Sequence, residues 1–284
     1  MIEQLSGQIA VLVLFYNKLE QTTECIQSFL PSGENIYVLN NGSTVSDFAV
    51  LQKRFQGNSE LHFLDAGKNL GPSGGRNYLI EHTTEPWLIF VDNDITIKPT
   101  QNWKQLLERF LAENQEAEIV CPNIFNVHEN SFMERLKLQI NNGVLDLIPV
   151  TNQVTNFFPE GGAVVKRDVF TRYGMYDEGM FAFEGYEFSL RCMQSHFGEL
   201  KVFCTDIIEL IHNHRFQEKK IDKDAVRERY NAQKMQVSYN RLVQKHSIVF
   251  QHDWAWWTGK QLEDMTSRKH LQKIKQKLKG LFGR

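Results

Sequence analysis

A short apolar run that ends in two carboxylates constrains the fold of this chain more than any other segment. Residues 87–91, Trp-Leu-Ile-Phe-Val, are followed directly by Asp92-Asn93-Asp94. A run of this length, rich in branched and aromatic side chains, is typical of a buried strand. Both acids then lie at its carboxyl end, where open α/β sheets place their ligands. The segment therefore predicts a buried strand with an acidic ligand site at its end.

Apolar runs and amphipathic segments alternate through the first half of the chain. We expect further strands at 9–15, 36–39 and 61–64, and helices at 19–30, 45–55 and 74–82. This order predicts an α/β fold whose mainly parallel sheet carries helices on both faces. Later elements are expected as a helix at 101–114, strands at 118–124 and 161–165, and helices at 188–195 and 224–246. Residues 126–158 show no clear pattern.

Composition and charge exclude several classes of protein. Of the 284 residues 42% are hydrophobic, enough for a sizeable core, and the net charge of −2 gives no bias toward nucleic acid. The four cysteines lie far apart without a Cys-x-x-Cys pair, so neither a zinc knuckle nor a disulfide framework is indicated. No apolar run approaches the ~18 residues of a membrane helix, and the first residues lack a signal-peptide pattern. We expect a globular, cytoplasmic protein.

Asp92 and Asp94 are candidate ligands of a divalent cation. Mg²⁺ and Mn²⁺ prefer carboxylate oxygen, and Mg²⁺ commonly leaves its other positions to water and substrate phosphate. A phosphorylated ligand is implied. Acids at the end of a strand also form turns or cap helices, so the pattern alone does not decide between these interpretations.

Other polar segments follow predicted strands and would reach the same edge of the sheet. Tyr16 and Asn17 follow the first strand, and Asn40 and Asn41 follow the second, where Asn-Gly is also an ordinary turn. The glycines of segment 69–77 allow close backbone approach, and the helix after it would offer free amides to an anion. The segment matches neither Gly-x-Gly-x-x-Gly nor the P-loop, which argues against a dinucleotide fold and an ATPase.

In their order, five segments of the chain resemble the family-2 glycosyltransferases of the GT-A fold. They are the strand end at 16–17, the Asn-Gly-Ser turn at 41–43, the Asn-x-Gly…Arg-Asn segment at 69–77, the Asp-x-Asp at 92–94 and segment 183–191. The resemblance spans about residues 8–215. It implies a GT-A domain at 1–222, divided into a nucleotide-binding half (1–125) and an acceptor half (126–222), followed by a helical region at 223–284.

The resemblance implies a donor site built by the first half of the chain. Its expected nucleotide-binding residues are Tyr16, Asn17, Asn40, Asn41, Asn69, Gly71, Arg76, Asp92 and Asn93. Asp94, with Asp92, would ligate the Mn²⁺ or Mg²⁺ that holds the diphosphate. Family members commonly carry an Asp where this chain has Asn40, and this difference puts the usual uracil contact in doubt.

An inverting transfer needs a carboxylate to take the proton of the acceptor hydroxyl. Family members usually carry Glu-Asp before a helix, and the Asp often serves as base, whereas this chain reads Glu184-Gly185. We therefore predict Glu184 as the base, with Glu187 as the second candidate. For Glu187 and Arg191, one helical turn apart, a surface ion pair is the preferred interpretation.

His212 and His214 follow another apolar run, at 208–211. Many relatives place a metal-ligating His after such a run, and imidazole suits Mn²⁺, while a purely structural role is the equal alternative. Gly161 and Gly162 would let the acceptor approach the backbone, unless they form a bulge or allow tight packing.

The sequence thus predicts a hexosyl- or deoxyhexosyltransferase that moves a sugar from a nucleoside diphosphate to a saccharide or lipid-linked glycan. Bacterial surface polysaccharide assembly is the setting that the resemblance implies. Two alternatives stay open. A sugar nucleotidyltransferase would carry a glycine- and lysine-rich loop after the first strand, and this chain has none there. A catalytically decayed nucleotide- or glycan-binding module would explain Gly185 and Asn40.

The end of the chain is basic. Residues 260–284 carry eight cations and two acids, a net charge of +6 that leaves −8 for the rest. With Leu278, Leu281, Phe282 and the tryptophans at 254, 256 and 257, this segment resembles an interfacial anchor at the inner face of the cytoplasmic membrane. A solvated charged helix beside a packed tryptophan cluster is the equal alternative.

Overall fold

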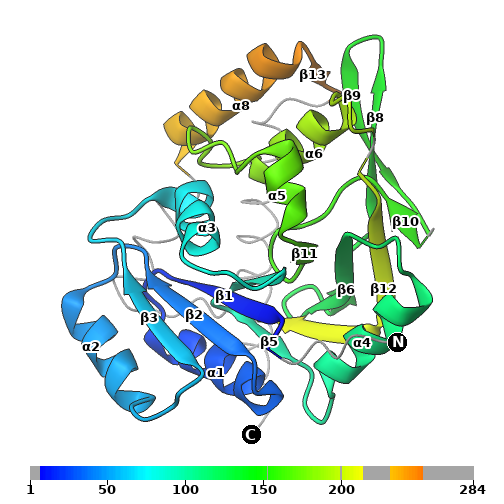
Figure 1. Ribbon diagram of the computed structural model, residues 1–284. Helices are drawn as coiled ribbons and strands as arrows, with labels where there is room; N and C mark the ends of the chain where they lie inside the picture. The colour runs from blue at the N-terminus through cyan, green and yellow to red at the C-terminus, as the bar shows by residue number, and fades with distance from the viewer. Residues whose placement is uncertain (1–6, 152, 199, 214–230, 252–284) are drawn as a thin grey trace, which may run out of the picture.

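A computed structural model describes residues 7–151, 153–198, 200–213 and 231–251 (Figure 1). Within them, one large sheet has the strand order β10-β12-β6-β11-β4-β1-β2-β3, with β5 paired to β12 and β7 to β6. A second sheet has the order β13-β9-β8. The α/β class with a mainly parallel central sheet is confirmed.

Four parallel strands form the first half of the large sheet. They are β1 (Ile9–Phe15), β2 (Asn35–Asn40), β3 (Leu61–Asp65) and β4 (Trp87–Asp92). The register pairs Phe15 with Asn40, Asn40 with Asp65, and Leu14 with Asp92, so the four carboxyl ends meet at one edge. The four predicted strands match within two residues at each end.

Helices cover both faces of this sheet because β1 is apolar on both sides. Val11, Val13 and Phe15 pack with α1 (Leu19–Phe29), α2 (Val45–Arg54) and α4 (Trp103–Glu113). Ala10 and Leu12 pack with α3 (Gly71–Glu81), α5 (Asp168–Tyr173) and α6 (Glu184–Met193). A strand buried on both faces reads as a continuous apolar run rather than an alternating one.

The second half of the sheet mixes strand directions. Its strands are β5 (Ile95–Ile97), β6 (Ile119–Asn126), β7 (Ser131–Phe132), β10 (Val154–Thr155), β11 (Val164–Lys166) and β12 (Val202–His212). β11 runs antiparallel to both β4 and β6, while β12 runs parallel to β6. The strand predicted at 161–165 begins only at Val164, and the helix predicted from residue 188 begins at Glu184. The prediction gave no strand at β5 and no helix at α5.

The region without a clear sequence pattern contains a hairpin. β8 (Leu136–Asn141) and β9 (Val144–Pro149) pair antiparallel, and Asn142 and Gly143 turn between them with φ of 50° and 77°. Positive φ at both positions is what an Asn-Gly hairpin turn requires. β13 (Val249–Phe250) pairs with β9, and α8 (Ala232–His246) lies beside α6 (Figure 1). The predicted helix at 224–246 is described only from Ala232.

Several predictions from the sequence fall outside the described residues. They are His214, the tryptophans at 254, 256 and 257, and the basic segment 260–284. The division between residues 222 and 223 stays a prediction. Across the part of the chain that the structure describes, no helix is both long and apolar enough to cross a membrane.

Gly143→Ala tests the hairpin turn. An added Cβ would have open space, with its nearest atom, the Ser247 carbonyl oxygen, at 3.8 Å. The left-handed backbone alone should therefore lower the free energy of unfolding, by about 1–2 kcal/mol. Gly143→Asn is the matched control, because Asn tolerates this conformation, and it should lose less. Urea denaturation measures both, and equal stability of Gly143→Ala and the wild type would contradict this turn.

Candidate active site

The ends of β1, β2 and β4 are tied together by short hydrogen bonds. The Asn17 amide donates to Ser43 Oγ at 2.8 Å, and the Asn93 side chain donates to the Asn17 carbonyl oxygen at 3.3 Å. Asn17 and Lys18 both have positive φ, at 58° and 56°, so the chain turns sharply after β1 and enters α1 at once. Such backbone strain persists only where the surroundings hold it in place.

The two asparagines after β2 organise the turns around them. Asn40 Oδ1 accepts from the Ser43 amide at 2.9 Å, and Asn41 Oδ1 accepts from the Leu70 amide at 2.9 Å. Asn41 Nδ2 also donates to the Gly71 carbonyl oxygen at 3.0 Å. Both side chains are buried. These bonds support the turn interpretation and leave the nucleotide role of both residues a prediction.

Most of the glycine-rich segment 69–77 lies in α3, which begins at Gly71, three residues before the predicted start. Gly71 has a φ of 72°, and its amide is held by Asn69 Oδ1 at 2.8 Å. The helix lies close to β1 and β2, because a Cβ at Gly75 would lie 2.7 Å from Leu14 Cδ2 and 3.1 Å from Asn41 Nδ2. This close packing places Arg76 at the strand ends.

Arg76 bridges two carboxylates that are far apart in the sequence. Its Nη1 lies 2.9 Å from Glu184 Oε1, and its Nη2 lies 3.3 Å from Asp92 Oδ1. Only 6% of the Arg76 side chain is exposed. Burial disfavours the charged guanidinium of Arg76 and would lower its pKa. The nearby carboxylates of Asp92 and Glu184 together have the larger effect and raise that pKa. The pair of contacts joins the end of β4 to the start of α6.

Asp94 and His212 form a second polar pair at the same edge. Antiparallel pairing of β5 with β12 brings His212 opposite Ile95, and its Nε2 lies 3.3 Å from Asp94 Oδ1. Lys18 Nζ lies 2.9 Å from the other oxygen, Asp94 Oδ2. The sequence pattern did not single out Lys18, although it directly follows the predicted Asn17.

The Asp94–His212 pair fits two ligands of one divalent cation. Carboxylate oxygen and imidazole nitrogen bind metals such as Zn²⁺ at about 2.0–2.2 Å, and two donors 3.3 Å apart can share one ion at such distances. Asp92 instead faces Arg76. No group of three His, Cys, Asp or Glu side chains that could hold a metal ion occurs among the residues that the structure describes. The described residues could thus supply two ligands, and their metal role stays a prediction.

A family model of known proteins matches this chain over residues 10–174, more than half of its length. Its description is glycosyl transferase family 2. The chain belongs to this family. It is a family-2 glycosyltransferase, and the donor of such an enzyme is a nucleotide sugar.

One relative and two solved structures are similar to this chain. An uncharacterized protein of Haemophilus influenzae is 23% identical over 173 residues, which are 59% of this chain and 92% of the relative. A structure of GalNAc-T7 with UDP, GalNAc and Mn²⁺ has a TM-score of 0.59 at 13% identity and covers 93% of this chain. A structure of S. aureus TarS 1-349 has a TM-score of 0.54 at 14% identity, covering 84% of this chain and 72% of that one.

These structural likenesses show the GT-A fold of the transferase. This chain spans 58% of the GalNAc-T7 chain in that structure. The sugar, the acceptor and the metal of the present transferase are therefore matters for proposal.

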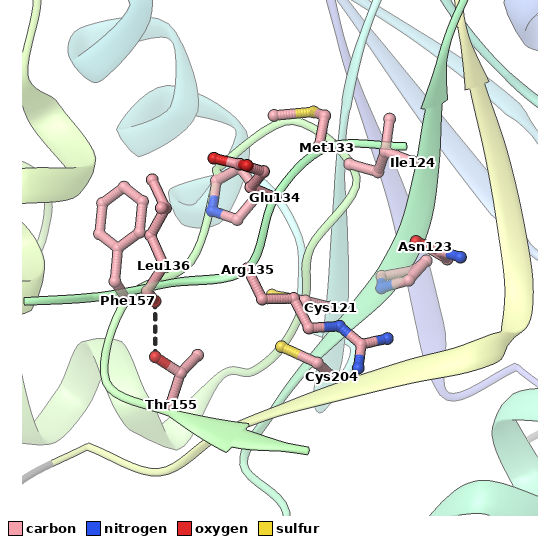
Figure 2. A pocket seen from close by; sticks show the side chains of 12 residues that line it. Cys121, Asn123, Ile124, Met133, Glu134, Arg135, Leu136, Thr155, Phe157 and Cys204 are labelled. Carbon is pink, nitrogen blue, oxygen red and sulfur yellow. Dashed lines mark hydrogen bonds between the residues drawn. The ribbon is translucent and has the colours of Figure 1, made fainter. Parts of the chain in front are cut away.

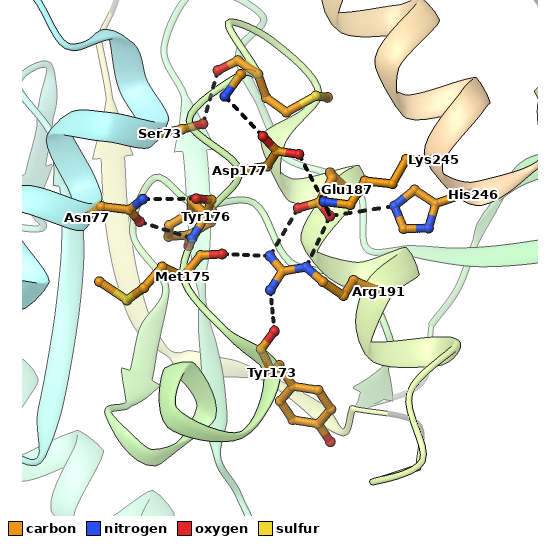
Figure 3. Close-up of polar contacts among 12 residues, drawn as sticks. Ser73, Asn77, Tyr173, Met175, Tyr176, Asp177, Glu187, Arg191, Lys245 and His246 are labelled. Carbon is orange, nitrogen blue, oxygen red and sulfur yellow. Dashed lines mark hydrogen bonds and ion pairs between the residues drawn. The ribbon is translucent and has the colours of Figure 1, made fainter.

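Glu187 of the transferase is surrounded by cations (Figure 3). It is fully buried, with Arg191 Nη2 at 3.0 Å and Lys245 Nζ at 2.8 Å from its oxygens, and His246 Nε2 at 3.6 Å. Lys245 also pairs with Asp177 at 2.9 Å. The predicted pairing with Arg191 is present, but it is buried where a surface position was expected. Its contacts join α6 to α8 and favour a structural role.

Gly161 and Gly162 are sites of tight packing in the transferase. A Cβ at Gly161 would lie 2.7 Å from Asp92 Oδ2, and one at Gly162, where φ is 96°, would lie 2.6 Å from Leu210 Cδ1. Gly162 also donates its amide to the Phe90 carbonyl oxygen at 2.6 Å. Tight packing therefore accounts for glycine at both positions. Binding of the acceptor sugar next to them stays a prediction.

Glu160, which the sequence pattern did not single out, lies among the charged groups of the site. Burial, followed by the charge of Glu184, raises its pKa to about 8, although Arg76 acts in the opposite direction. The residue immediately precedes Gly161-Gly162, and this position is the sequence signal that could have pointed to it.

A separate small cavity of about 80 Å³ is lined by Cys121, Cys204 and Arg135 among others. It includes none of the predicted site residues (Figure 2).

Glu187→Gln tests the structural role of Glu187. Burial opposes its charge, but His246, Arg191 and Lys245 lower the pKa of Glu187 to about 2. The folded pKa lies below the unfolded value of about 4.3, so the stabilisation is complete above that pH and is lost as pH falls toward 2. At pH 7 the variant should lose roughly 3–5 kcal/mol of unfolding free energy. The difference from the wild type should shrink on acidification.

Urea denaturation between pH 7 and pH 3 measures this difference. Glu20→Gln is the matched control, because Glu20 pairs with Arg54 at the exposed surface and 55% of its side chain is accessible. That variant should lose no more than about 1 kcal/mol at any pH. A loss for Glu187→Gln that does not change with pH would contradict the role assigned to the charged carboxylate.

Proposed function

We propose that this family-2 glycosyltransferase moves a hexosyl or deoxyhexosyl group from a nucleoside diphosphate to a hydroxyl of a saccharide or lipid-linked glycan, with inversion. One observation carries the proposal: the Asp94–His212 pair and the cluster of Arg76, Asp92 and Glu184 lie at the same edge of the sheet. Carboxyl edges of α/β sheets are where such folds bind nucleotides. We name the second set the Arg76 cluster.

Asp94 and His212 would hold the divalent cation, Mn²⁺ or Mg²⁺. When bound, such an ion neutralises charge that develops on a departing diphosphate. Lys18, on the turn after β1, adds a fixed positive charge beside Asp94. The GalNAc-T7 structure contains UDP and Mn²⁺, which are therefore the first nucleotide and metal to test here.

The Arg76 cluster would organise the sugar-transfer centre. In an inverting transfer the acceptor oxygen attacks the anomeric carbon, a carboxylate takes the hydroxyl proton, and the nucleoside diphosphate leaves with the bonding electrons. Glu184, the base predicted from the sequence, belongs to this cluster through its contact with Arg76. Arg76 thus fixes the position of an acid of the acceptor half relative to the nucleotide half.

The turn after β1 argues against the nucleotidyltransferase alternative. β1 ends at Phe15 and α1 begins at Leu19, which leaves Tyr16, Asn17 and Lys18 between them. Three residues with two left-handed positions cannot form a glycine- and lysine-rich phosphate loop. The decayed binding module stays an outcome that binding and turnover assays distinguish.

A cytoplasmic location with attachment to the inner face of the membrane through residues 260–284 remains part of the proposal. It rests on the charge of +6 in that segment. Anionic lipid surfaces attract such basic clusters by about 1 kcal/mol per cation.

Thermal melting with nucleotides and metal tests the donor site. UDP, GDP and their common sugar conjugates are added with and without Mn²⁺. A matching nucleotide at one hundred times its Kd should stabilise the wild type by about 2.7 kcal/mol. Because Asp94 would hold the metal, Asp94→Ala should lose the metal-dependent part of this stabilisation.

Asp206→Ala is the matched control, since its carboxylate is exposed on β12 and pairs with Arg135. It should respond to nucleotide and Mn²⁺ as the wild type does. An Asp94→Ala protein with the full metal-dependent response would refute the metal role of Asp94. If the folded wild type is stabilised by no nucleotide, the proposed donor site is refuted.

A further inference from the structure

The start of α6 lacks a side chain at the position where family members usually carry an aspartate, and Glu160 occupies that space. A Cβ built at Gly185 would lie 2.2 Å from Glu160 Oε1 and 2.8 Å from Glu160 Cδ. Heavy atoms at such distances overlap, so a side chain at 185 would have to move the Glu160 carboxylate out of its present place. The carboxylate of Glu160 thus lies where the side chain of an aspartate at position 185 would lie.

The backbone on either side of Glu160 explains how its carboxylate reaches this place. Gly161 follows it and lies so close to Asp92 that a Cβ there would be 2.7 Å from Oδ2. The Gly162 amide then joins the edge of β4 through the Phe90 carbonyl oxygen. The segment therefore runs past the end of β4 directly into the space before α6.

The three glutamates near this point differ in their partners. Glu184 Oε1 accepts from Arg76 at 2.9 Å, and both oxygens of Glu187 lie in ion pairs. Glu160 Oε1 is buried and has no hydrogen-bond partner within the described residues, while the residue as a whole is partly exposed. A buried unpaired oxygen is costly unless a ligand or water completes it. Among these three side chains, Glu160 is therefore the one with a buried oxygen left to receive a hydroxyl group.

The charges that face Glu160 come from three elements. Glu184 on α6 and Asp92 on β4 oppose its ionisation, and Arg76 on α3 favours it. Burial, and after it the charge of Glu160, raises the pKa values of Tyr176 and Tyr186. Burial and this excess of negative charge raise the proton affinity of the Glu160 carboxylate, which makes the ionised group a stronger proton acceptor.

We propose that Glu160, and not Glu184, is the general base of the transfer, and that its carboxylate replaces the aspartate that Gly185 lacks. The inference rests on the proposed function. The acceptor oxygen forms a bond to the anomeric carbon while the bond from that carbon to the diphosphate breaks. The proton of the acceptor hydroxyl passes to the Glu160 carboxylate, and the diphosphate leaves with the electron pair. Glu184 is then a positioning residue that holds Arg76.

Glu160→Gln tests the base directly. With the nucleotide sugar that stabilises the wild type most, release of nucleoside diphosphate is measured with water and with a panel of saccharide and lipid-extract acceptors. The variant should lose roughly 10²–10⁴-fold in kcat, the usual contribution of a general base. Its melting response to nucleotide and Mn²⁺ should equal that of the wild type. Glu116→Gln, an exposed glutamate paired with Lys201, is the control and should keep full activity.

A relocated carboxylate tests the geometry. Gly185→Asp alone should destabilise the protein and reduce turnover, because the new side chain overlaps Glu160. Combined with Glu160→Gly, the same substitution returns a carboxylate to nearly the same space. The double variant should regain stability and exceed Glu160→Gln in kcat by roughly tenfold or more.

The outcomes separate the two proposals. Glu160→Gln with wild-type kcat would overturn the role of Glu160 and leave the transferase function intact. Loss of turnover only in Glu184→Gln, with nucleotide binding kept, would assign the base to Glu184 instead. A wild type that binds nucleotide but turns over none of the donors would be a binding module, and this result would overturn both proposals.

Discussion

The buried guanidinium of Arg76 is the interaction on which the site depends. It contacts Asp92, at the end of a strand in the first half of the chain, and Glu184, at the start of a helix in the second half. A charge buried this deeply persists only with well-placed partners, and removing one of two partners is strongly unfavourable. The contact therefore fixes the distance between the two halves more firmly than apolar packing alone would. Asp94, His212 and Glu160 take their places around this fixed point.

Close backbone approach is the second constraint. Gly75, Gly161 and Gly185 each stand where a Cβ would meet a neighbour at 2.2–2.7 Å. Each of them lets a different element reach the carboxyl edge: α3 against β1, segment 160–162 against β4, and α6 against Glu160. The site is crowded by backbone as much as by side chains, so small substitutions here should disturb the chemistry before they disturb the fold.

The first half of the fold was predictable because its strands and helices follow from short-range sequence patterns. β1 to β4 are buried on both faces and read as continuous apolar runs, and the helices between them have a clear period. α3 was placed three residues too late, because Gly71-Pro72 reads as loop although a proline suits the first turn of a helix. The hairpin β8–β9 carried an Asn-Gly signal at 142–143, but it rests on β13, a strand of two residues more than a hundred positions away.

The site was predictable in part for the same reason. Asp92, Asp94 and Arg76 follow from strand ends and from the order of motifs, whereas the position of Glu160 depends on an empty place 25 residues further along the chain, at Gly185. The spacing of residues in the sequence cannot show that a side chain of one segment fills the space left by a glycine of another. Glu187 looked like a helix-surface residue for a related reason, because the helix that buries it, α8, lies about fifty residues later.

The pairing of β13 with β9 also bears on how the protein is made. The small sheet and the ion pairs between α6 and α8 both need residues 245–250, whereas β1 to β4 pair with one another within residues 9–92. Domains generally form as the chain leaves the ribosome, from the N-terminus onward. Pairing among β1 to β4 can therefore begin while the rest is still being synthesised. The hairpin β8–β9 must wait for more than a hundred further residues, and its unpaired edge is exposed to chaperones and to wrong partners during that time.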